Sequence, residues 1–431
     1  MVQCRSNIKN SRLCDSVIQF TVIFILMFPG TARSESLKAL QDMAVANRKV
    51  VEKYRLDVRK GENDETIARS AFLPSVDAVY TANRLDEDST SEKQENSSVR
   101  GAITYNIFSG FKDEYNVTAA GLLKKAKEYE LESIIQDIRY AVALRYLDIF
   151  GKKSSLKVAE DEYRLLQKRH EDSKNMYSVG LIKKNDLLKI KVQMDDADQR
   201  LKKAEAEFKK SVNRIERETD ADVDSGELTF NEFDEIPGVK DFAFYESRMF
   251  EKRNEIKAIE AVLQSKEFGV KIADSAYYPS VDISGSYRKF GDNYAVGAGG
   301  DSDDEIRVQL NAKINLFDGY KKDSSVAKAN LEVETAGRDL YELKKTLSTG
   351  LKNVLLDYEV SLKNLKVAES SISQADENLR ITDISFKEGV ETAADVLDAI
   401  YYLSRARYNF INAKNELFTD YYGLVRMTDD F

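Results

Sequence analysis

Two stretches of this sequence repeat one apolar pattern at an offset of 209 residues. In both, apolar residues recur at alternating steps of three and four, which is the heptad of helices that pack in coiled coils. The first series is Leu187, Ile190, Met194, Ala197, Leu201, Ala204 and Phe208. The second series is Val396, Ala399, Leu403, Ala406, Phe410, Ala413 and Leu417. Because the two series agree position for position, we predict a chain built from two copies of one helical unit.

A glycine stands before each heptad series and ends a long run that holds no proline. The runs cover about 111–178 and 320–387, and Gly180 and Gly389 follow them. A glycine in the left-handed conformation is a common end of an α-helix. We therefore predict two helical hairpins with tips near 180 and 389. At 1.5 Å per residue, their long helices would each reach roughly 100 Å.

The duplication extends beyond the hairpins. Residues 106–111 (Asn-Ile-Phe-Ser-Gly-Phe) match residues 315–320 (Asn-Leu-Phe-Asp-Gly-Tyr), and residues 156–160 recur unchanged at 365–369. Solenoid repeats span about 20–50 residues, so a repeat of this length is one large unit used twice.

Each unit is predicted to hold a helix, two strands and a long helical hairpin, in that order. Pro74 and Pro279 mark the change from helix to extended chain. The first unit covers 35–218, with a helix over about 35–70, strands over about 76–85 and 99–108, and a tip near 180. A linker over 219–239 follows. The second unit covers 240–431, with a helix over about 240–275, strands over about 281–290 and 306–316, and a tip near 389.

The predicted strands alternate apolar and polar residues with a period of two. In the last strand, Val308 and Leu310 face one way, while Gln309 and Asn311 face the other. A half-buried sheet in a soluble protein gives the same pattern. The strand lengths and the charged polar faces favour a membrane barrel around a water-filled lumen. Four strands cannot close such a barrel, so several chains must combine.

The loops between the strands, about 86–98 and 289–304, are polar and acidic. They lack the ligand spacing of a calcium-binding loop, so we interpret them as solvated loops. Over the whole chain the formal net charge is −9. This acidic balance argues against nucleic acid as a partner.

Residues 1–34 have the pattern of a signal peptide. A basic start is followed by an apolar run, a break at Pro29-Gly30, and small residues around Ala32. The apolar run is shorter than the roughly 20 residues that a membrane-spanning helix needs. Both cysteines, Cys4 and Cys14, lie in this segment, so the exported chain is predicted to contain no disulfide.

The combination of these features resembles the TolC-like outer-membrane channel family, which serves efflux and type I secretion. The resemblance rests on the twofold repeat, the unit of strand, Phe-x-Gly and long helix, and the tip motifs at 179–181 (Val-Gly-Leu) and 395–399 (Asp-Val-Leu-Asp-Ala). It implies a fold that is mainly α with membrane β. In this fold a homotrimer forms a twelve-stranded outer-membrane β-barrel on a long periplasmic α-helical coiled-coil barrel.

The resemblance also implies a location and partners. The expected location is the cell outer membrane, with a large periplasmic extension. The expected partners are a periplasmic adaptor (a membrane fusion protein), an inner-membrane transporter and outer-membrane lipid.

The same resemblance implies a pore constriction at Asp395 and Asp398, where carboxylates of several chains would form an acidic ring. The alternative for Asp395 is helix capping, since Thr392-Ala-Ala-Asp395 has the form of a capping box. The equivalent positions of the first unit are Asp186 and Lys189, so the acidic pair occurs once per chain.

The resemblance further places a closing latch at Asp186, Phe386 and Glu391. Phe386 stands where the family commonly has a tyrosine, and Glu391 where it has an arginine. A phenyl ring cannot hydrogen-bond to Asp186, and Glu391 would repel it, so the latch is expected to differ in this chain. The tips would contact the adaptor through Gly180, Leu181, Gly389 and Val390.

Catalysis finds little support in the sequence. His170 is the one histidine, and it lies in a charged helical stretch. We predict no catalytic, cofactor or metal site. The predicted function is an exit channel of a tripartite export system, for type I protein secretion or for small-molecule and drug efflux. It would be a passive conduit gated at its periplasmic tip. The alternative is a structural periplasmic coiled-coil protein or adaptor.

Overall fold

The computed structural model describes residues 36–88, 93–296 and 304–431. The predicted signal peptide over 1–34 lies outside these ranges. Parts of the two acidic loops, 89–92 and 297–303, also lie outside them.

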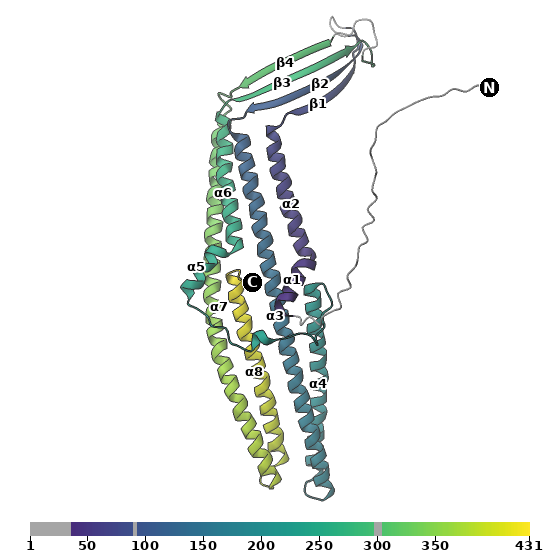
Figure 1. Ribbon diagram of the computed structural model, residues 1–431, viewed down its shortest axis with the longest axis vertical. Helices are drawn as coiled ribbons and strands as arrows, with labels where there is room; N and C mark the ends of the chain where they lie inside the picture. Colours follow the sequence, from purple (N-terminus) through teal and green to yellow (C-terminus); the bar gives the residue numbers. More distant parts are fainter. Residues whose placement is uncertain (1–35, 89–92, 297–303) are drawn as a thin grey trace, which may run out of the picture.

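The molecule is a long bundle of helices with a sheet at one end and two hairpin tips at the other (Figure 1). The first unit runs α1 (Leu37–Asn47), α2 (Lys49–Arg69), β1 (Ser75–Arg84), β2 (Glu95–Phe108), α3 (Lys112–Ser178) and α4 (Lys184–Thr219). The second runs α5 (Phe242–Lys252), α6 (Asn254–Asp274), β3 (Ser280–Gly291), β4 (Asp304–Lys313), α7 (Lys321–Lys387) and α8 (Ala393–Met427). Three short 3-10 turns, η1 (Ser70–Phe72), η2 (Asn231–Phe233) and η3 (Ser275–Tyr277), lie between these elements. Within the described ranges, none of the helices is both long and apolar enough to cross a membrane.

The four strands form one antiparallel sheet in the order β1-β2-β3-β4. Its pairing places apolar residues of all four strands on one face, as in the rows Val76–Ile103–Gly285–Val308 and Ala78–Gly101–Tyr287–Ile306. The opposite face carries polar and charged residues, as in the row Asp77–Ala102–Ser286–Arg307. Val76, Ile306 and Val308 are each more than 70% exposed in the single chain. The period-two pattern therefore yields a sheet whose apolar face the chain itself does not cover.

Two strand boundaries differ by three or four residues from those predicted, and the others by two or fewer. β2 begins at Glu95 instead of 99, because its polar start pairs with the end of β1, where Arg84 lies opposite Glu95. β4 ends at Lys313 instead of 316, because Lys313 pairs with Ser280, the first residue of β3. Beyond Lys313 the chain has no neighbouring strand to pair with.

The helices predicted over 35–70 and 240–275 are each two helices, which corrects that part of the sequence analysis. Arg48 separates α1 from α2 with φ −62° and ψ 123°, and Arg253 separates α5 from α6 with φ −61° and ψ 121°. Both breaks are anchored in the middle of the molecule. Arg48 pairs with Glu218 of α4, and the Arg253 guanidinium donates to the carbonyl oxygen of Met427 at 3.3 Å. Arginine is a good helix former, so the sequence carries no local signal for these breaks.

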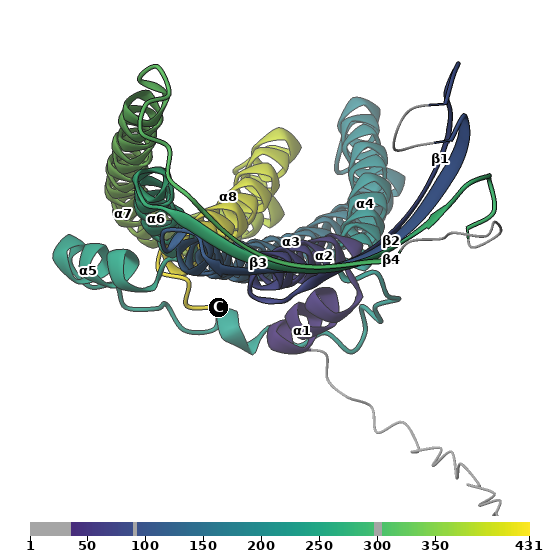
Figure 2. The ribbon, with the colours of Figure 1, turned by 90° about the horizontal axis from the view of Figure 1, so that it is seen from above.

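The middle of the molecule holds the main hydrophobic core. There α1, the middle of α3, the end of α4, the linker and the last turns of α8 bury a set of large side chains: Leu40, Tyr146, Ile149, Ile215, Phe233 and Phe418. A second cluster joins α5, α6, α7 and α8. Viewed from above, α1 and α5 lie on the convex side of the curved sheet, whereas α4 and α8 lie on its concave side (Figure 2). The two long hairpins are therefore joined to each other and to the C-terminus at mid-height.

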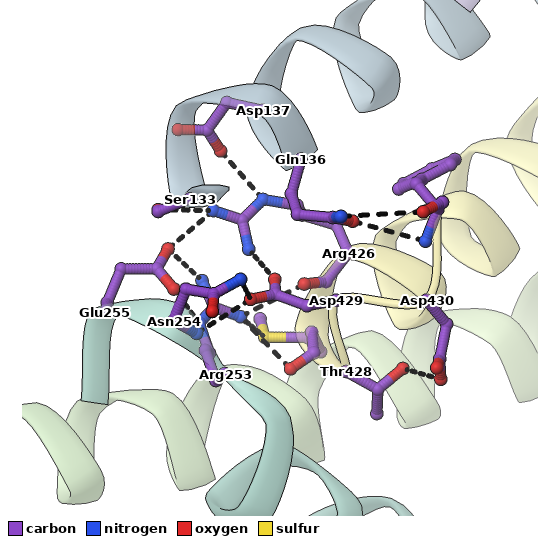
Figure 3. A network of polar contacts seen from close by, with 12 residues as sticks. Ser133, Gln136, Asp137, Arg253, Asn254, Glu255, Arg426, Thr428, Asp429 and Asp430 are labelled. Carbon is purple, nitrogen blue, oxygen red and sulfur yellow. Dashed lines mark hydrogen bonds and ion pairs between the residues drawn. The ribbon is translucent and has the colours of Figure 1, made fainter. Parts of the chain in front are cut away.

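A polar network around Arg426 fixes the end of the chain (Figure 3). The Arg426 guanidinium, whose side chain is 8% exposed, pairs with Asp137 of α3, Glu255 of α6 and Asp429. The Asp429 carboxylate also accepts a hydrogen bond from the backbone N–H of Asn254 at 2.8 Å, at the start of α6. Three segments far apart in the sequence, in α3, at the start of α6 and at the end of the chain, thus meet at one buried cation.

Candidate functional site at the hairpin tips

Both hairpin tips have the same backbone geometry. Gly180 and Gly389 have φ of 76° and 77°, in the left-handed region. After α3, the N–H of Leu181 donates to Met176 O at 2.9 Å and that of Gly180 to Tyr177 O at 3.0 Å. The second tip repeats this pattern, with Val390 donating to Ser385 O and Gly389 to Phe386 O. These paired bonds are Schellman caps, which is the turn that glycine favours.

The residues after the two glycines point away from the molecule. Leu181 is 72% exposed and Val390 is 75% exposed, and Val179 beside the first glycine is 70% exposed. A side chain added at Gly180 or Gly389 would meet no atom of the chain within 4 Å. Each tip therefore presents an apolar side chain on an open turn.

The first turn of α8 contains the capping box that the sequence suggested for Asp395. Thr392 is the N-cap, its hydroxyl accepts from Asp395 N, and the Asp395 carboxylate accepts from Thr392 N at 2.8 Å. The hydrogen bonds from Thr392 hold the pKa of Asp395 below its usual value, and the neighbouring Asp395 raises the pKa of Glu391. Asp398, one turn further on, is exposed. The two aspartates therefore differ, because Asp395 is bound to its own helix start and Asp398 is not.

The three predicted latch residues have different surroundings in the structure. Phe386 is buried in an apolar cluster at the tips, with Leu166, Ile190, Val396 and Ile400. Glu391 lies beside the capping box. Asp186 is half-buried in the first turn of α4, and it makes no hydrogen bond or ion pair through its side chain to any other described residue.

A different set of side chains links the two hairpins. Arg169 of α3 forms an ion pair with Asp383 of α7, and its guanidinium lies over the Phe386 ring, 5.4 Å from the centroid. Lys387 also pairs with Asp383, at 2.7 Å. Neither Arg169 nor Asp383 was predicted as a site residue, because in the sequence both look like ordinary members of charged helix surfaces. Their position near the predicted tips could have marked them as candidates. That they meet depends on how α3 packs against α7.

Two grooves run between the hairpins near the tips. The α4/α8 groove, of about 490 Å³, is lined by Asn185, Leu188, Lys189, Val192, Gln193, Ala394, Leu397 and Asp398. The α3/α7 groove, of about 320 Å³, is lined by Leu165, Lys168, Arg169, Asp172, Asp376, Leu379, Arg380, Asp383 and Lys387. The described ranges contain no cluster of three or more histidine, cysteine or acidic side chains arranged to hold a metal ion.

A family model decides the relationship of this chain to known proteins. The model described as outer membrane efflux protein matches residues 40–219 and 247–428, which are the two structural units almost in full. The chain belongs to the outer membrane efflux protein family. The predicted TolC-like relationship is therefore confirmed.

Individual members of this family are similar at low sequence identity. The outer membrane protein TolC of Vibrio cholerae is 23% identical over 371 residues, which cover 81% of this chain and 80% of the relative. The crystal structure of the outer membrane protein VceC, from the same species, aligns with a TM-score of 0.76 and 15% identity over 91% of this chain and 95% of that one. The Campylobacter jejuni outer membrane channel CmeC aligns with a TM-score of 0.75 and 15% identity, over 91% and 85%.

Membership in the outer membrane efflux protein family agrees with the predicted fold class. Four strands, two long helical hairpins and a duplicated order are the architecture shared with these channel structures. The alternative of a structural coiled-coil protein is wrong for this chain, because the match covers the strands as well as the helices.

Proposed function

We propose that this chain is the outer-membrane exit channel of a tripartite export system and acts as a passive conduit gated at its hairpin tips. One observation carries the proposal. A four-stranded sheet with an uncovered apolar face stands at one end of helices that reach roughly 100 Å, and the whole belongs to the outer membrane efflux protein family.

The sheet supports a homotrimer in the outer membrane. β1 and β4, ten residues each, are its two edges, and they run antiparallel to each other in the order β1-β2-β3-β4. In lipid an open edge leaves backbone groups without hydrogen bonds, so edges must pair between chains. Three chains joined β4 to β1 give twelve strands. The apolar face would then contact lipid and the polar face would line the lumen.

The opposite end, in the periplasm, would be the gate. Asp395 and Asp398 of three chains are the proposed constriction, and the acidic side chains would attract cations there. Closure in this chain would rest on the Arg169–Asp383 pair and its stacking on Phe386, in place of a contact of Asp186 with Phe386 or Glu391. This link joins the two hairpins of one chain, so breaking it frees them to separate.

The tips would also bind a periplasmic adaptor, which connects the channel to an inner-membrane transporter. Leu181 and Val390 offer apolar contact, and the open turns at Gly180 and Gly389 allow close approach of another backbone. The proposed role of the tips is to gate a conduit and to bind the adaptor, and we propose no enzymatic activity. Both cargo classes, secreted proteins and small molecules, remain compatible with this arrangement.

The proposal is tested by fractionation and conductance. The wild-type chain is expected in the outer membrane as a detergent-stable trimer, and it should form single channels in a planar bilayer. Val308→Lys places a charge on the apolar face, which costs about 2–4 kcal/mol at the membrane midplane, and should reduce membrane-inserted trimer. Gln309→Lys, on the polar face of the same strand, is the matched control and should insert normally. A monomer in the soluble periplasmic fraction would contradict the proposal.

A further inference from the structure

The α4/α8 groove is built from matching positions of the two units. Leu188 and Leu397 are equivalent at the offset of 209 residues, as are Asn185 and Ala394. The same offset relates Lys189 to Asp398, and both line this groove. The duplication thus brings two equivalent helix faces together, with opposite charges at one equivalent position.

Lys189 and Asp398 are the two charged side chains among the described residues that line this groove. Both are exposed, and neither forms an ion pair with another described residue. Asp186 lies one turn before Lys189 on α4, yet the two are not paired. By contrast, Lys191 on the same helix is paired with Asp195 at 2.6 Å.

Of the two aspartates Asp395 and Asp398, Asp398 is the one whose carboxylate is free to interact with an ion. The Asp395 carboxylate accepts two hydrogen bonds from Thr392, at its backbone N–H and its hydroxyl, and so is held at the helix start. Asp398 has no such bond within the described ranges. An approaching ion therefore meets the Asp398 carboxylate with the Lys189 ammonium on the opposite wall of the groove.

We propose that Lys189 is the counter-charge of Asp398 and sets the charge preference of the gate. This inference rests on the proposed function, because it needs the α4/α8 face to line the pore. Figure 2 supports that orientation, since α4 and α8 lie on the concave side of the sheet, toward which a closed barrel would have its axis. Three chains then contribute three Asp398 carboxylates and three Lys189 ammonium groups, so Lys189 offsets the Asp398 charges and leaves the Asp395 charges of the ring.

The first test measures ion selectivity in planar bilayers from the reversal potential in a salt gradient. Lys189→Gln removes the positive charge and should raise the cation-to-anion permeability ratio by roughly threefold, the effect of one screened charge at short range. Asp398→Asn should lower the ratio. The double variant should return toward the wild-type value if the two charges act on each other.

Two controls separate this effect from a general change in surface charge. Lys191→Gln removes one positive charge from the same helix outside the groove and should leave the ratio unchanged. Asp186→Asn removes the carboxylate one turn before Lys189 on α4 and should leave the effect of Lys189→Gln intact. An equal shift in Lys189→Gln and Lys191→Gln would overturn the inference. Loss of wild-type conductance would instead overturn the proposed function and the inference with it.

The second test asks whether the two positions face each other in the assembled protein. The natural cysteines are confined to positions 4 and 14, so the Lys189→Cys/Asp398→Cys variant adds the only pair in the described ranges. A short bismaleimide should cross-link this pair but not Lys191→Cys/Asp398→Cys. A cross-linked product of monomer size, with altered mobility, would place the pair within one chain. A cross-linked product of dimer or trimer size would place it between chains. No cross-link in either form would overturn the inference.

Discussion

Arg169 of α3 and Asp383 of α7 form an ion pair that joins the two hairpins of one chain, with Phe386 packed under the guanidinium. Their side chains are 9% and 25% exposed, so the pair is shielded from solvent more than a typical surface pair. Removing Arg169 breaks this link between the hairpins and leaves Asp383 paired with Lys387 of its own helix.

Arg169→Gln is therefore expected to weaken the closed state of the gate. A loss of about 1.4 kcal/mol would raise the open population tenfold. The current of single channels at fixed voltage measures this change. Arg164→Gln is the control, because Arg164 lies on the same helix with 69% of its side chain exposed. If both variants conduct like the wild type, the Arg169–Asp383 pair is not part of the latch.

The capping box of α8 gives a local prediction. Thr392→Ala removes the N-cap hydroxyl and should destabilise the start of α8 by about 1 kcal/mol. Hydrogen exchange is expected to speed up in the first turn of α8 and to stay unchanged in the middle of the helix. Thr419→Ala, which removes a hydroxyl bonded to the Asn415 carbonyl in the same helix, should leave exchange at the tip unaltered.

The tip glycines should respond to substitution according to backbone conformation alone. Gly180→Ala forces a β-carbon into the left-handed region, which costs about 1–2 kcal/mol, although no atom of the chain lies within 4 Å. Gly180→Asn should cost less, because asparagine adopts that region more readily. Protease cleavage at the tip should therefore increase from wild type through Gly180→Asn to Gly180→Ala. Equal cleavage of the two variants would contradict this prediction.

The Arg426 network predicts a large effect on stability. Arg426→Met keeps the volume of the side chain but leaves Asp137, Glu255 and Asp429 without their shared cation. Breaking a buried ion pair in this way costs about 3–5 kcal/mol. Thermal unfolding in detergent should show the loss. Arg405→Met is the control, as Arg405 is exposed on the same helix.

Asp430, in the same region, should make the stability of the protein depend on pH in the acidic range. Burial alone would raise the pKa of Asp430, but hydrogen bonds from Arg248, Lys252 and Thr428 outweigh it and lower the pKa to about 2. A carboxylate with a lowered folded-state pKa stabilises the protein above its unfolded pKa of about 3.9 and loses that contribution as the pH falls toward 2. Asp430→Asn should therefore be less stable than wild type at pH 6, and the difference should vanish near pH 2. A difference that is independent of pH would contradict this assignment.

Much of the fold could be predicted from the sequence because the duplication shows each structural pattern twice. The matched heptads predicted the hairpins, and Gly180 and Gly389 predicted their tips. The breaks at Arg48 and Arg253 were not visible, since each depends on partners more than 150 residues away in the sequence. The early start of β2 was missed for a related reason, because Asn96-Ser97-Ser98 has the composition of a loop until β1 pairs with it.

The candidate site was only partly predictable. The capping role of Asp395 followed from local spacing, and the capping box confirms it. The burial of Phe386 and the pairing of Arg169 with Asp383 depend on which faces of α3 and α7 meet. One sequence fixes the periodicity of each helix, but the rotation of one helix against another comes from packing.

The unpaired edges β1 and β4 also bear on how such a protein is made. A lone chain presents two open backbone edges and one broad apolar face, so it has no stable state in water or in lipid for its sheet. If three chains close the barrel, insertion depends steeply on the concentration of exported chains. The long helices, whose bonds are internal, are then the parts able to form first and bring the sheets together.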